Sequence, residues 1–118
     1  MEVTLEHLRP EASSLSVTVQ ITSKMNVSAF VAKRKVTGFV ADQISTNLHG
    51  GEPVLVIGDR IRWRVPVILS LPPIGERGVA GEIDVDVETG QLQISSELFQ
   101  EIEDRAEHLV ARTPHPTA

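Results

Sequence analysis

The chain has 118 residues, a length typical of one folded domain. Hydrophobic residues make up 41% of it and charged residues 23%, close to the globular average, which argues against wholesale disorder. The formal net charge of −5 gives no general attraction for nucleic acid, and the lack of cysteine excludes a disulfide framework and thiolate metal sites.

The beginning of the chain lacks the basic start and the apolar segment of a signal peptide. No run of about 18 apolar residues occurs that could span a membrane. We therefore expect a soluble cytoplasmic protein without membrane contact. Residues 1–13 show no clear period and are expected to be a flexible leader, residues 14–112 a single domain, and residues 113–118 a disordered tail.

Residues 14–23 alternate apolar and polar side chains, the two-residue period of a half-buried strand. An alternating strand near a terminus can pair within its own chain or across a homodimer. Met25 is an alternative start, which leaves open whether residues 1–24 belong to the essential fold.

The segment 27–48 predicts an amphipathic helix, because its apolar residues recur at spacings of three and four. Asn26 is the expected N-cap, and Gly50 and Gly51 are the expected stop. Lys33, Arg34 and Lys35 follow one another on this helix, so they point in different directions and favour solvated side chains over one basic patch.

Two strands are predicted next, at residues 53–57 and 60–71, joined by a two-residue turn at Gly58-Asp59. The second strand places its aliphatic residues and Trp63 on one face, which must be buried. Pro66 cannot donate a backbone hydrogen bond, so it indicates an edge position or a bulge near the middle of this strand.

Residues 72–78 are expected to form a loop, and residues 81–87 a strand with Ile83, Val85 and Val87 inward. A hairpin with Gly90 in the left-handed conformation leads into a returning strand at 91–95. Ser95 or Ser96 then caps a last helix with an apolar stripe. These elements predict an α+β fold: an antiparallel sheet of four or five strands with two helices packed on one face.

Two rows of opposite charge alternate with the buried positions of these strands. One row is Arg60, Arg62 and Arg64; the other is Glu82, Asp84, Asp86 and Glu88. The arginines could read phosphates, or the rows could neutralise each other across paired strands, which we favour. Antiparallel pairing about the 72–78 loop would set Arg64 near Asp86 and Arg62 near Glu88.

No pattern for catalysis or for metal or cofactor binding stands out. The acids of residues 84–88 echo a calcium loop, but the sixth position is Thr89 and the twelfth is Ser95 where glycine and glutamate are needed. The four histidines are scattered, and the chain has no nucleophile elbow, P-loop or dinucleotide fingerprint. We expect no catalytic residue, no cofactor and no metal.

The order of helix, short strand and long strand with Trp63, followed by Val85-Asp86-Val87-Glu88-Thr89-Gly90-Gln91-Leu92, resembles the PepSY-like domains. Those modules end a sheet with the pattern V-D-x-x-T-G-x-V/L, and the resemblance covers residues 27–94. It implies a helix packed on an antiparallel sheet and a non-catalytic role, often binding or restraining a protease or another protein. The acidic last helix departs from the pattern, and the usual domain is exported.

The leading hypothesis is a non-enzymatic protein-interaction or regulatory module, an antitoxin-like or inhibitor-like partner of another small bacterial protein. The acidic last helix, with Glu101 and Asp104, is where we expect a basic partner to bind. The alternatives are a nucleic-acid-associated regulator that uses the arginine face, and a small-ligand-binding or hydrolytic domain. The candidate interaction surface consists of Arg60, Arg62, Arg64, Asp84, Asp86, Glu88, Glu101 and Asp104.

Overall fold

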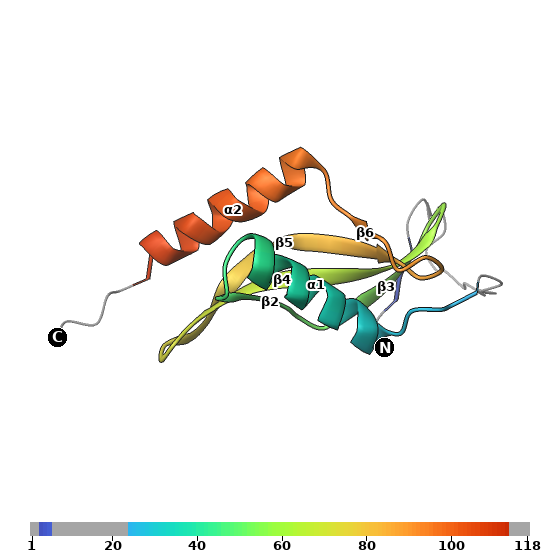
Figure 1. The fold of residues 1–118 in the computed structure, drawn as a ribbon, viewed down its shortest axis with the longest axis horizontal. Helices are drawn as coiled ribbons and strands as arrows, with labels where there is room; N and C mark the ends of the chain where they lie inside the picture. Colours follow the sequence, from blue (N-terminus) through green and yellow to red (C-terminus); the bar gives the residue numbers. More distant parts are fainter. Residues whose placement is uncertain (1–2, 6–23, 114–118) are drawn as a thin grey trace, which may run out of the picture.

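A twisted sheet with two helices on one face makes up the part of the chain that the computed structural model describes, residues 3–5 and 24–113 (Figure 1). Its elements in chain order are β1 (Val3–Leu5), α1 (Ala29–Gln43), β2 (Leu48–Gly50), β3 (Val54–Ile57), β4 (Ile61–Leu71), β5 (Gly75–Asp86), β6 (Leu92–Gln93) and α2 (Ser96–Ala111). The strand predicted at 14–23, and with it the proposed dimer edge, lies outside the described residues.

Strand β4 is the centre of the sheet, whose order is β1-β3-β4-β5-β6, with β2 also paired to β4. Strands β2 to β6 are antiparallel, which confirms the predicted α+β class. Strand β1 falls in the segment expected to be a leader and pairs parallel with β3.

The inward face of β4 confirms the two-residue period. Trp63, Val65, Val67 and Leu69 are all buried, and the side chains between them face the other side of the sheet. Both helices cover this inward face, because their buried residues join the same core cluster. Those helix residues are Ala32, Val36 and Val40 of α1 and Ile102 and Ala106 of α2.

Both predicted ends of the first helix are wrong. Ser28, not Asn26, is the N-cap, and its hydroxyl accepts a hydrogen bond from the Val31 amide. The helix ends at Gln43, and Gly50 belongs to β2, a strand that the sequence did not predict. The Gly50 amide donates to the Thr37 hydroxyl at 2.9 Å, and a side chain at Gly50 would press on the helix backbone. Glycine there serves close approach of strand and helix rather than helix termination.

The turns also differ from the predictions. Three residues, 58–60, separate β3 from β4, so Arg60 lies in the turn instead of in the strand. Most of the expected 72–78 loop is strand, because β5 already begins at Gly75. Gly90 has a φ of 74°, the predicted left-handed conformation.

Pro66 lies in the central strand, not at an edge. Its carbonyl accepts a hydrogen bond from the Gly51 amide, in the gap between β2 and β3. Backbone N and O of one strand residue point to the same side, so its missing N–H also faces this gap. The predicted bulge is present nearby, as a register shift between Val67 and Ile68.

Helix α2 begins at the predicted cap, since the Ser95 hydroxyl accepts a hydrogen bond from the Leu98 amide. Its far end is tied to β5 through Thr113, which is buried and whose hydroxyl accepts a hydrogen bond from Arg77. Thr113, the first residue of the expected tail, therefore contacts the folded part of the chain.

Glycines in β5 let α2 pack closely on the sheet, and this gives a test of the fold. A Cβ added at Gly81 would lie 2.8 Å from Cγ1 of the buried Ile102. We expect Gly81→Ala to lower the free energy of unfolding by about 1–3 kcal/mol, because the added methyl overpacks this contact. Urea denaturation followed by circular dichroism measures the change.

Gly38→Ala is the matched control. Gly38 lies inside α1, and an added Cβ meets no atom of the described residues within 4 Å. The same substitution should raise the free energy of unfolding there by up to about 1 kcal/mol, since alanine is the better helix former. Equal effects at both positions would contradict the packing of α2 on β5.

Candidate functional site

Charged side chains cover the outer face of the sheet, on β4, β5 and the turn before β4. We call Arg60, Arg62, Arg64, Asp84 and Asp86 the charge ladder. Arg60 bonds to Asp86 at 2.6–2.7 Å, while Arg62 and Arg64 both bond to Asp84, at 2.7 and 3.0 Å. The prediction that the two charged rows neutralise each other is confirmed for these five residues.

The predicted pairing within the rows is wrong by two residues. Arg62 lies opposite Asp86, and Arg64 lies opposite Asp84. The turn at 72–74 is shorter than the expected loop, and the two register shifts in β5 only partly offset the difference. Glu88 consequently lies beyond the end of β5, exposed in the following turn.

Asp86 is the buried member of the ladder, with 3% of its surface exposed. One carboxylate oxygen accepts hydrogen bonds from the amides of Glu88 and Thr89, at 2.8 and 3.0 Å, and the other binds Arg60. The hydrogen bond from Thr89 lowers the pKa of Asp86 most; burial opposes it, but the Arg60 and Glu88 contacts bring the pKa to about 2. The Asp86 carboxylate is therefore ionised, and in this form it holds the 87–90 turn in place.

This turn holds the beginning of α1. The amides of Asn26 and Val27 both donate to the Val87 carbonyl, and the Lys35 ammonium donates to the Gly90 carbonyl at 2.9 Å. The buried Trp63 adds an indole hydrogen bond to the Val27 carbonyl. The first turn of α1 is thereby fixed to the turn that Asp86 organises.

The two candidate acids of α2 lie on its exposed side. Glu101 and Asp104 are both exposed, and Asp104 accepts a hydrogen bond from Gln100 at 3.0 Å. They are far along the chain from the ladder, and the structure gives no contact between them and the ladder residues among the described positions.

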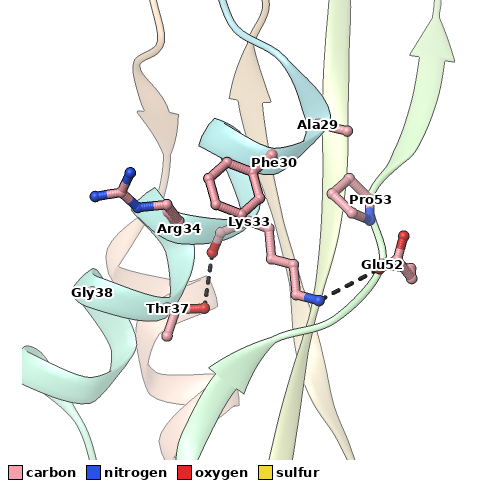
Figure 2. Close-up of a pocket in the computed structure, with 8 residues that line it drawn as sticks. All are labelled: Ala29, Phe30, Lys33, Arg34, Thr37, Gly38, Glu52 and Pro53. Atoms are coloured by element: carbon pink, nitrogen blue, oxygen red, sulfur yellow. Dashed lines mark hydrogen bonds and ion pairs between the residues drawn. The ribbon is translucent and has the colours of Figure 1, made fainter.

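One hollow lies between α1 and the segment that links β2 to β3 (Figure 2). We call it the Phe30 groove. It has a volume of about 550 Å³ and is lined by Ala29, Phe30, Lys33, Arg34, Thr37, Gly38, Glu52 and Pro53. Phe30 is 67% exposed, and the guanidinium carbon of Arg34 lies 5.7 Å from its ring centroid. An aromatic ring and an arginine thus stand together in solvent at the groove.

Basic groups dominate the polar rim of the Phe30 groove. Lys33 reaches across it to Glu52 at 3.4 Å, a loose contact at an exposed carboxylate. In residues 3–5 and 24–113, no carboxylate pairs with Arg34. The groove therefore offers an apolar surface with an unneutralised positive charge.

Phe30 was not among the residues predicted to form a site. A signal was present, because Phe30 and Val31 are large apolar residues outside the stripe that Ala32, Val36 and Val40 form. Whether another segment covers them is decided by tertiary structure, which the spacing of one helix does not give.

A second hollow lies where the end of α1 meets α2, and we call it the interhelix notch. It has a volume of about 320 Å³ and is lined by Ile44, Ser45, Leu69, Glu103, Ala106, Glu107, Val110 and Ala111. Val110 is 38% exposed there, so an apolar side chain borders the opening. Carboxylates supply the charge of this notch, the opposite of the Phe30 groove.

A histidine–serine pair joins β2 to β4. Nε2 of His49 lies 3.0 Å from the Ser70 hydroxyl, and Nδ1 lies 3.3 Å from the Gly50 carbonyl. Such a pair is also the beginning of a nucleophilic site, which further requires donors for an oxyanion. The Ser70 amide already donates a hydrogen bond to the Asn47 carbonyl. The His49–Ser70 hydrogen bond therefore serves to link the neighbouring strands β2 and β4.

Other classes of site receive no support from the described part of the chain. Within it, no three metal-ligating side chains come together, and neither helix has the length and apolar character needed to cross a membrane. No family model, no curated protein and no solved structure matches the chain. The resemblance to PepSY-like domains therefore stays a prediction.

The role of Asp86 gives a prediction about stability and pH. Because its pKa falls from 3.8 to about 2 on folding, its contribution is present above pH 3.8 and is lost as the pH falls toward 2. We expect Asp86→Asn to lower the free energy of unfolding by about 1–2 kcal/mol at neutral pH. Urea titrations at several pH values should show a smaller acid-induced loss in the variant than in the native chain.

Asp59→Asn is the matched control, since Asp59 is an exposed aspartate in the neighbouring turn. Its effect should stay within about 0.5 kcal/mol. A destabilisation by Asp59→Asn as large as that by Asp86→Asn would show that general charge, and not the Asp86 contacts, governs stability.

Proposed function

We propose that this chain is a non-enzymatic protein-interaction module that binds a partner protein at the Phe30 groove. Interaction modules work by presenting a few large side chains on a fixed surface, and this chain has both features. Phe30 and Arg34 are the large side chains, and the contacts of Asn26, Val27 and Lys35 with the 87–90 turn fix the helix that carries them.

The single observation that carries the proposal is the exposed ring of Phe30. A phenylalanine that is 67% exposed leaves most of its apolar surface in water, which burial against a partner would relieve. Aromatic residues and arginine are enriched among the residues that supply most of the energy of protein interfaces. Val31, itself 37% exposed, extends this apolar surface along the helix.

The charge ladder supports a structural role for the arginine row over recognition of nucleic acid. Each of its three arginines contacts an aspartate, so a phosphate would have to displace an existing ion pair. Nucleic-acid recognition depends on cations that can replace counterions along the backbone. We therefore place the interaction surface on the helix face and not on the outer face of the sheet.

Site-specific photo-crosslinking tests the proposal. A benzophenone amino acid in place of Phe30 should give one defined protein adduct in native lysate, unchanged by nuclease treatment and identified by mass spectrometry. In competition, the unlabelled native chain should block the adduct, and Arg34→Ala should block it about tenfold less well, as expected for loss of an interface arginine.

The same benzophenone residue in place of Glu82 is the control, because Glu82 is exposed on the outer face of the sheet. That position should give no defined adduct. Equal labelling from positions 30 and 82, or no adduct from position 30, would contradict the proposed function.

A further inference from the structure

We infer that the partner at the Phe30 groove is a second copy of this chain, which receives Phe30 in its interhelix notch. This inference rests on the proposed function, and it adds the identity of the partner. The chain carries both an exposed aromatic knob and an apolar notch, and the charges around them are opposite.

The sizes of the two features agree. The notch has a volume of about 320 Å³, and a cavity of about 150 Å³ is enough to hold benzene. Ile44, Ala106 and Val110 supply apolar contacts for a phenyl ring. Since Val110 is also partly exposed, the insertion would cover apolar surface on both copies at once.

The charges of the two features are complementary. Arg34 lies beside Phe30, and Glu103 and Glu107 line the notch. In the described parts of the chain, Arg34 has no acidic partner, and neither glutamate has a basic one. Insertion of Phe30 would bring Arg34 to the two carboxylates, where charge-assisted hydrogen bonds form.

The contrast extends over both helices. The charged residues of α1 are Lys33, Arg34, Lys35 and Asp42, and those of α2 are Glu97, Glu101, Glu103, Asp104, Arg105 and Glu107. One helix is therefore basic on balance and the other acidic, so attraction between copies is favoured where α1 meets α2. Two copies with the same helix in contact would instead bring like charges together.

A two-fold axis would form this contact twice. Phe30 lies in the first turn of α1, and the notch begins with Ile44 directly after the last turn. When α1 of each copy lies against α2 of the other about such an axis, the first turn of each α1 meets the notch of the other copy. Both copies then give a knob and receive one, the self-complementary arrangement of a closed dimer.

Charge reversal tests the inference with the full chain. Sedimentation equilibrium should show a dimer for the native protein, and Arg34→Glu or Glu107→Arg alone should weaken dimerisation about tenfold or more, since each places like charges at both contacts. Mixing the two variants should restore the dimer, because every knob then meets a notch of opposite charge. The double variant should also dimerise.

Lys24→Glu and Glu82→Arg are the matched controls, as both residues are exposed, neither belongs to α1 or α2, and neither lines the groove or the notch. They should leave the dimerisation constant unchanged. Circular dichroism of every variant checks that the fold is kept.

A native chain that stays monomeric at all concentrations would overturn the inference, as would a dimer that none of the charge reversals affects. These outcomes are separate from failure of the proposed function. A monomeric chain whose position-30 label still captures a different protein would keep the interaction module and remove only self-association. A chain that neither dimerises nor labels any protein would lose both.

Discussion

A buried aspartate sets the position of the helix on which the proposed function depends. Asp86 ends β5, and its two carboxylate oxygens divide their bonds between the amides of the following turn and the guanidinium of Arg60. The turn, in turn, accepts the hydrogen bonds of Asn26 and Val27 that start the path into α1. A single ionised group therefore links the central sheet to the segment that leads into α1.

The two faces of the sheet divide the work of the molecule. The inward face packs against both helices and forms the aliphatic core. On the outer face, the arginines and aspartates of the charge ladder form ion pairs with one another. What is left for a partner is the side of the helices that faces away from the core. There the exposed Phe30 and the acidic notch are separated along α1 and carry opposite charge.

Much of the fold could be predicted from the sequence because the period of two holds along β4 and in the last part of β5. Trp63, Val65 and Ile83 could only share a buried face. The register between these strands could not be predicted, because bulges leave the alternation on either side intact while they shift the pairing. Strand β2 was not predicted because three residues are too few to show a period. Its pairing with β4 also depends on contacts between residues far apart in the sequence.

The candidate site was predicted only in part, for a related reason. Spacing along a strand identifies which charged residues share a face, so the two rows of the charge ladder could be predicted. The pairing of individual arginines with individual acids was predicted two residues away from where it lies. Spacing along a helix identifies which residues face the core, but leaves open which of the others a neighbouring segment covers.

Residue-resolved hydrogen exchange of Asp86→Asn tests most directly whether Asp86 links the sheet to the segment that leads into α1. We expect faster exchange at the amides of Glu88 and Thr89 and also at those of Asn26 and Val27, while the amides that pair β4 with β5 should exchange at the native rate. Unaltered exchange at Asn26 and Val27 would contradict the account.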